Sequence, residues 1–188
     1  MRVLTGQLVT AVFATAALAI PLQAQVDEKN LIAIAKAAVV AEVNGSPSEA
    51  PRGNQSPRPV FVTIEVGGKV VGCRGGLVAR SGSLEEEIRL AARSAAAHDP
   101  RYRPLTKADL AHFQVTVTLV QGLEPISDVA GLTPEDGLVL TSGQRSGIVL
   151  PWEGKDPQVR LDWAYRKAGV PSGSPAKLQR LKAIRFKG

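Results

Sequence analysis

The amino-acid sequence predicts an α+β domain with a mainly antiparallel sheet. Helical and strand patterns are mixed along the chain, without the regular alternation of a parallel βαβ fold. Two neighbouring strand patterns are joined by Gly67-Gly68, and glycines can adopt the positive φ angles of a tight hairpin. The 188 residues, of which 44% are hydrophobic, are enough for one domain with its own core.

The first 25 residues, "MRVLTGQLVTAVFATAALAIPLQAQ", have the layout of a secretory signal peptide. Arg2 precedes a 13-residue run without a charge, Leu8 to Ile20, and a small residue, Ala24, follows Pro21. A retained anchor is the alternative, but a membrane span needs about 20 apolar residues. We therefore predict a signal peptide at 1–24 and a single domain at 25–188. The protein is expected to be exported, periplasmic or secreted, with no membrane span after cleavage.

The first expected elements are a helix and a hairpin. The segment 26–45 has apolar residues at helical spacing, with Asp27 able to cap its start and Gly45 to end it. "VFVTIEV" (60–66) alternates as a strand does, and 69–73 is the returning strand after the glycine turn.

The remaining elements follow from the same rules. In "SLEEEIRLAARSAAAHD" (83–99) Ser83 and Glu86 form a capping box for a helix. "FQVTVTLV" (113–120) is a second alternating strand, and 137–151 reads as two short strands. Asp156 and Pro157 open a helix that Gly169 ends, and "AIRF" (183–186) is a final strand.

The charge pattern favours anionic partners without indicating nucleic acid. The net charge is +6, and removal of Arg2 with the signal leaves 6 − 1 = +5. The basic residues are scattered except in "KLQRLKAIRFK", where no aromatic platform for stacking bases alternates with them. A solvated basic surface is the simpler interpretation. Two His residues fourteen positions apart and one Cys predict no metal site, and the sequence identifies no cofactor.

The stretch "GGKVVGCRGG" (67–76) contains the only cysteine, Cys73. A thiol is a nucleophile near neutrality only if a cation or a helix N-terminus lowers its pKa. Arg74 is adjacent, but neighbouring side chains of a strand point to opposite faces unless the strand bulges or ends. His98 is a possible base. The alternative is that Cys73 is a small buried hydrophobe, as lone cysteines often are. Backbone amides of the stretch, with Arg74 and Arg80, could bind an anion.

These residues resemble the AMMECR-type domain family, also called AmmeMemoRadiSam system protein A. Residues 70–75, "VVGCRG", are similar to its hexapeptide L-R-G-C-I-G, and Asp99 to Tyr102 match its D-P-R-F/Y segment. The segments 137–151 and "YRKAGV" (165–170) also look like family motifs, so the resemblance spans about Val60 to Gly169. It implies an antiparallel sheet with flanking helices in a larger and a smaller lobe.

Departures from the family pattern surround the cysteine. The family Arg before Gly-Cys is Val71 here, and the Ile after Cys is Arg74. Because positions 71 and 73 share a face of a regular strand, we expect the Cys face to have lost a positive charge. The family's L-P-Q-V is "LPWE" (150–153), and an export signal is unlike its usual cytosolic members.

Two functional hypotheses follow. In the first, the protein is an exported, enzyme-like domain in which Cys73 is catalytic. The expected ligand-binding residues are Gly72, Arg74, Gly75, Asp99 and Arg101, because motifs on loops often carry function. In the second, it is a non-catalytic accessory module that binds a small anionic ligand or a protein partner in the same place. A purely structural role for "DPRY", as a turn, remains open.

Overall fold

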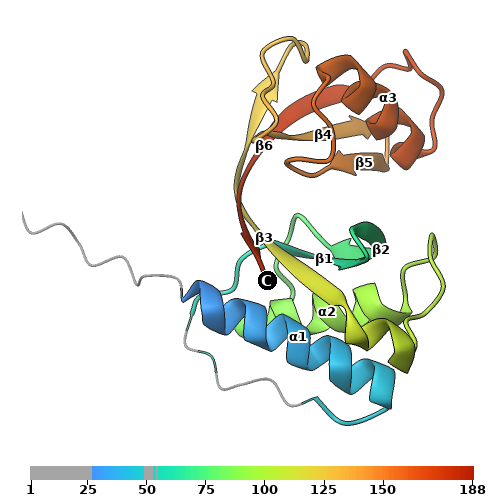
Figure 1. Ribbon diagram of the computed structural model, residues 1–188. Coiled ribbons are helices and arrows are strands. Elements are labelled where there is room, and N and C mark those ends of the chain that lie inside the picture. Colours follow the sequence, from blue (N-terminus) through green and yellow to red (C-terminus); the bar gives the residue numbers. More distant parts are fainter. Residues whose placement is uncertain (1–26, 49–52, 54) are drawn as a thin grey trace, which may run out of the picture.

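The computed structural model describes residues 27–48, 53 and 55–188, which form one six-stranded sheet with three α-helices (Figure 1). The elements are α1 (Glu28–Asn44), β1 (Val60–Val66), β2 (Lys69–Gly75), α2 (Leu84–Ala97), the short 3-10 helix η1 (Lys107–Ala111), β3 (Phe113–Ile126), β4 (Gly137–Ser142), β5 (Arg145–Val149), α3 (Pro157–Ala168) and β6 (Lys177–Lys187). The expected cleavage site after Ala24 lies outside the described residues. Within them, no helix combines the length and hydrophobicity needed to cross a bilayer.

The sheet has the order β2-β1-β3-β6-β4-β5, and every neighbouring pair is antiparallel. The α+β prediction is therefore confirmed. β3 and β6 run together through both ends of the molecule, while β2 and β5 are the two edges (Figure 1). The sheet curls along these long strands, so that its two edge strands face each other.

The larger lobe consists of α1 and α2 packed on β1, β2 and the first part of β3 (Figure 1). The predicted alternation of β1 holds, since Val60, Val62 and Ile64 are buried against the helices. α2 begins at the predicted cap, where the Ser83 side chain accepts a hydrogen bond from the amide of Glu86. We call this helix-covered face of the sheet its outer face.

The smaller lobe consists of α3, β4, β5 and the adjoining parts of β3 and β6. The expected caps of α3 are present: Asp156 accepts from the amide of Val159, and Gly169 is left-handed with φ 67°. β3 and β6 are longer than predicted, because they pair with each other beyond their alternating apolar segments, with a bulge between Val120 and Gly122.

A third apolar cluster lies on the inner face of the sheet, opposite the helices. It contains Phe61 of β1, Val120, Val139, Leu150 and Leu181, and Cys73 packs against it. Phe61 alternates with the outward-facing Val60 and Val62, as strand geometry requires. This inner face, between the two lobes, is where the candidate site lies.

Candidate functional site

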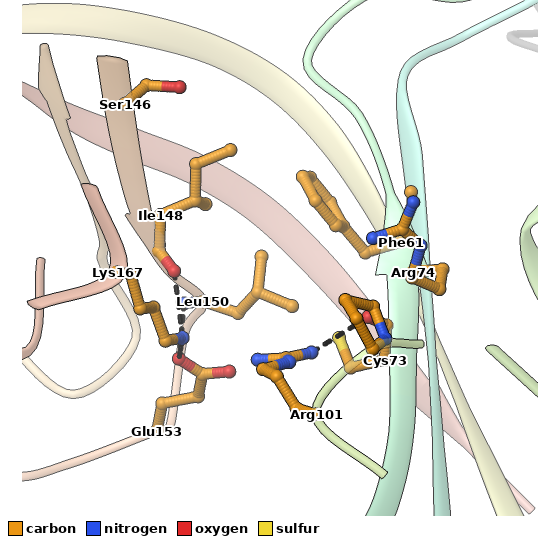
Figure 2. Close-up of a pocket in the computed structure, with 11 residues that line it drawn as sticks. Phe61, Cys73, Arg74, Arg101, Ser146, Ile148, Leu150, Glu153 and Lys167 are labelled. Carbon is orange, nitrogen blue, oxygen red and sulfur yellow. Dashed lines mark hydrogen bonds and ion pairs between the residues drawn. The ribbon is translucent and has the colours of Figure 1, made fainter. Parts of the chain in front are cut away.

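A pocket of about 310 Å³ opens between the two lobes. The larger lobe contributes Phe61, Cys73, Arg74, Gly75, Pro100 and Arg101, and the smaller lobe contributes Ser146, Ile148, Leu150, Glu153 and Lys167. Figure 2 shows the two groups facing each other, with the Arg101 side chain extending into the space between Cys73 and Glu153. Two stretches that the sequence singled out, "GGKVVGCRGG" and "DPRY", meet at this pocket.

Asp99 joins these two stretches through four hydrogen bonds. Its Oδ2 accepts from the Cys73 amide at 2.8 Å and from Arg101 Nη2 at 2.7 Å. Its Oδ1 accepts from the amide and Nε of Arg101, at 3.1 and 2.9 Å. Burial opposes ionisation of Asp99, whose side chain is 1% exposed, but the bonds from Arg101 and Cys73 outweigh it and lower its pKa. Asp99 does not line the pocket; it positions residues that do.

Arg101 is the cation that the pocket holds most firmly. Its Nη2 donates both to Asp99 and to the carbonyl oxygen of Cys73, the latter at 3.0 Å. The bond with the Asp99 carboxylate is the main reason that the pKa of Arg101 is raised. Nη1 forms no hydrogen bond with the described residues, and a guanidinium has five N–H donors. Two donors therefore remain for a ligand.

Cys73 lines the pocket and is only partly exposed. Thr63, its cross-strand partner on β1, donates a hydroxyl hydrogen bond to its sulfur at 3.2 Å. Burial is the largest influence on the thiol and raises its pKa above the ordinary value of 9.0, despite the opposing effects of Thr63, Arg101 and Lys167. At neutral pH the group is therefore a thiol rather than a thiolate.

The expectation about Val71 is wrong. A bulge in the β1–β2 pairing, between Ile64 and Glu65, turns both Val71 and Gly72 toward the outer face. Val71 packs in the large-lobe core, whereas Cys73 faces inward. The replacement of the family Arg by Val71 therefore removes no charge from the Cys73 side.

Gly72 is placed differently from its predicted role. A Cβ at Gly72 would overlap the carbonyl oxygen of Ala95 in α2, so this glycine allows close packing of helix and strand and does not line the pocket. Gly75, with φ 154° and no room for a side chain beside the backbone of Val60 and Phe61, does line it.

Arg74 lies at the rim. As strand alternation predicts, its Nε reaches the α2 side and donates to Ser94 at 3.3 Å, while other atoms line the pocket. The cations that act on the thiol are Arg101 and Lys167 instead. His98, considered as a base, ends α2 and is absent from the pocket lining.

The wall from the smaller lobe is organised by Lys167 and Glu153. Lys167 Nζ donates to Glu153 Oε2 at 2.6 Å and to the carbonyl oxygen of Ile148 at 2.8 Å (Figure 2). The same Glu153 oxygen accepts from the Leu150 amide at 3.1 Å, which holds the loop after β5. An ammonium has three donors, so one of the Lys167 hydrogens remains available.

Of the residues that the sequence motifs predicted for the site, those that line the pocket lie on only one of its walls. Sequence signals for the wall of the smaller lobe existed as well. Leu150 and Glu153 lie in the family-like segment 150–153, and Lys167 lies in "YRKAGV". Phe61 and Ile148 carried no signal beyond strand alternation. Within the described residues no cluster of three or more His, Cys, Asp or Glu side chains could hold a metal ion.

Comparisons with known proteins agree with the fold and with the family resemblance. The AMMECR1 family profile matches residues 30–188. A Thermotoga maritima protein is 33% identical over 132 residues, which cover 68% of this chain and 76% of that protein. An Aeropyrum pernix protein is 33% identical over 162 residues, covering 77% and 70%.

A solved structure has the same fold. The crystal structure of an uncharacterized protein from Pyrococcus horikoshii superposes with a TM-score of 0.74 at 24% identity, covering 85% of this chain and 90% of that one. The profile match, which extends over most of the chain, is what decides the family. This protein therefore belongs to the AMMECR1 family.

Proposed function

We propose that this protein is a binding module whose pocket between the lobes takes a small anionic molecule, such as a phosphate or carboxylate compound. The observation that carries the proposal is the charge of the pocket lining. Three cationic side chains, Arg74, Arg101 and Lys167, line it with a single carboxylate, Glu153. The apolar side chains of Phe61 and Ile148 line the same space, so the ligand would also have an apolar part.

Two of the three cations are ion-paired, Arg101 with Asp99 and Lys167 with Glu153, but each keeps N–H donors that the pairing does not use. Arg101 is fixed by Asp99 and by the Cys73 carbonyl, yet its Nη1 donors are free among the described residues. Lys167 is fixed by Glu153 and Ile148 and retains one donor. Side chains that are already ordered lose little further entropy when a ligand binds, which favours binding.

A nucleophilic role for Cys73 is the second candidate, supported by the position of its sulfur in the pocket. Burial and, to a smaller extent, the charge of Glu153 raise the pKa of this thiol. Among the described residues the side-chain hydrogen bond of the sulfur comes from Thr63, which donates to it, and His98 does not line the pocket. The binding function is therefore the better supported of the two. In the binding function, the S–H group of Cys73 contacts the ligand without reacting.

The test is a titration of the ¹⁵N-labelled protein with inorganic phosphate, followed by amide chemical shifts. We expect saturable shifts at Cys73, Gly75 and Arg101, and weaker binding at higher ionic strength because the contacts are charged. Lys167→Gln should weaken binding about 10-fold, the loss expected for one charge-assisted hydrogen bond.

Arg166→Gln is the matched control, because Arg166 is the adjacent basic residue of α3 and does not line the pocket. Its affinity should equal that of the unmodified protein. Equal losses in both variants, or shifts spread over the surface without saturation, would mean that phosphate responds only to the net charge and would reject the proposed site.

We also propose that the protein is exported, on the basis of residues 1–24. N-terminal sequencing of the protein recovered from the cell envelope or the medium is expected to begin at Gln25. Recovery of the chain from the cytosol with Arg2 still present would reject this proposal.

A further inference from the structure

A second, smaller pocket of about 120 Å³ adjoins the first on the inner face of the sheet. Leu150 and Glu153 line both pockets. Thr63 lines the second, and its hydroxyl is bonded to the sulfur of Cys73, which lines the first. The two spaces therefore adjoin, with Leu150 and Glu153 at their shared boundary.

Trp152 forms part of the second pocket and is 54% exposed. Its φ angle is 67°, and in the described part of the chain no other non-glycine residue has a positive φ. Its amide donates to the carbonyl oxygen of Pro134 at 2.8 Å, and the flanking Glu153 is bonded to Leu150 and Lys167, so the loop is held in this conformation. A large aromatic ring is thus kept on the surface at a backbone angle that disfavours it, which points to a use other than packing.

Arg185 of β6 lines the same pocket and is partly buried. Among the described residues its guanidinium has no hydrogen bond or ion pair. The nearby carboxylates are engaged elsewhere: Glu65 with Lys187 at 2.6 Å, and Glu153 with Lys167 at 2.6 Å. A half-buried cation beside an exposed aromatic ring is a suitable environment for an electron-rich planar group.

We infer that the second pocket is a subsite for an aromatic ring of the ligand, which stacks on Trp152 and meets the guanidinium of Arg185. The ligand class is then a small molecule with one aromatic ring linked to an anionic group. The size fits, because a cavity of about 150 Å³ accommodates benzene, and this pocket of about 120 Å³ is open on one side. The inference rests on the proposed function, since the anionic group would occupy the first pocket.

The experiment measures dissociation constants for phenyl, benzyl and 2-phenylethyl phosphate, with inorganic phosphate and cyclohexyl phosphate as non-aromatic controls. The series varies the distance between ring and phosphate. At least one aromatic ester should bind roughly 10-fold more tightly than either control, as expected for one stacking contact. Its binding should quench the fluorescence of a Trp163→Phe variant, in which Trp152 is the only tryptophan.

Trp152→Asn removes the ring while leaving a residue that tolerates the left-handed conformation, so this variant is expected to fold at least as stably. Arg185→Met keeps the apolar stem and removes the charge. Each should cost roughly 10-fold in affinity for the aromatic ester and leave the affinity for inorganic phosphate unchanged. Arg103→Met, a substitution of an exposed arginine outside both pockets, is the matched control.

The outcomes separate the two proposals. If inorganic phosphate binds but no aromatic ester binds more tightly, the ring subsite is rejected and the anion pocket stands. If cyclohexyl phosphate binds as tightly as the aromatic esters, the second pocket is merely apolar and the assignment to Trp152 and Arg185 is wrong. If no compound binds, both proposals fail. If only an aromatic ester binds, and Trp152→Asn abolishes its binding, the ring subsite holds without the anion pocket.

Discussion

Replacing Asp99 with Asn should destabilise the fold by about 3 kcal/mol, although the two side chains have nearly the same shape. All four groups around the Asp99 carboxylate are N–H donors: two on Oδ1 from Arg101, and two on Oδ2 from Arg101 and Cys73. Whichever way the amide is oriented, its NH₂ faces two donors. Two hydrogen bonds are then lost, and the remaining two go to a neutral acceptor.

The magnitude follows from the number and exposure of these bonds. A hydrogen bond to a charged group contributes about 1.5–3 kcal/mol, so two would give about 3–6 kcal/mol. The Asp99 side chain is 1% exposed, whereas that of Arg101 is 47% exposed. Water can therefore replace part of the hydrogen bonding that Arg101 loses, so the expected loss of stability lies at the lower end of this range, about 3 kcal/mol. The Cys73 amide donates to the same buried carboxylate, where water has little access, so its lost bond is replaced less readily.

The assay is urea unfolding at neutral pH, followed by far-UV circular dichroism, with the m-value checked for constancy. Asp156→Asn is the matched control: it is the same substitution at an exposed helix N-cap, where Asn and Asp are equivalent, so its cost should stay within about 0.5 kcal/mol. A change at Asp99 no larger than that of the control would refute the assigned bonding.

The pH dependence provides a second check. The folded-state pKa of Asp99 lies below its ordinary value of 3.8, so the carboxylate stabilises the fold fully above that pH. This contribution is lost as the pH falls from 3.8 through the lower folded-state pKa. The difference between the two proteins should therefore be constant near neutrality and shrink in acid.

Three further predictions concern β2 and the pocket beside it. Gly72→Ala should lower the free energy of unfolding by about 2 kcal/mol, because the added Cβ would overlap the carbonyl oxygen of Ala95 and overpacking of this kind costs about 1–3 kcal/mol. Gly82→Ala is the control in the same urea assay. Its added Cβ meets nothing within 4 Å, so its loss of stability should be far smaller. The pH midpoint of Cys73 alkylation by iodoacetamide should lie above 9.0 in the folded protein, mainly because of burial, and fall toward 9.0 in denaturant. Glu153→Gln should lower that midpoint, since the carboxylate's charge opposes thiolate formation; a midpoint that stays in place would show that Glu153 does not act on Cys73.

Local chemistry made most of the fold predictable. Helix caps such as Ser83 and Asp156 act within a few residues of their own position, so the order of residues is sufficient to identify them. The glycine turn at Gly67-Gly68 has φ angles of 57° and 76°, as the hairpin requires. The α+β class and the family followed from these signals and from the order of motifs. The lengths of β3 and β6 did not, because they depend on pairing between distant segments.

The amino-acid sequence by itself determined most of the helices and strands and their caps, and it singled out the Cys73 and Asp99 stretches that meet at the pocket. Only the tertiary structure decided what these residues face. The bulge opposite Ile64 reverses the side of Val71, and strand alternation in one sequence cannot reveal a bulge that arises from pairing with another strand. The curl of the sheet brings its two edges together, so Lys167 and Glu153 oppose Arg101 although nothing local connects them. The pocket exists because long-range packing, which is not encoded in short spacings, closes the sheet on its inner face.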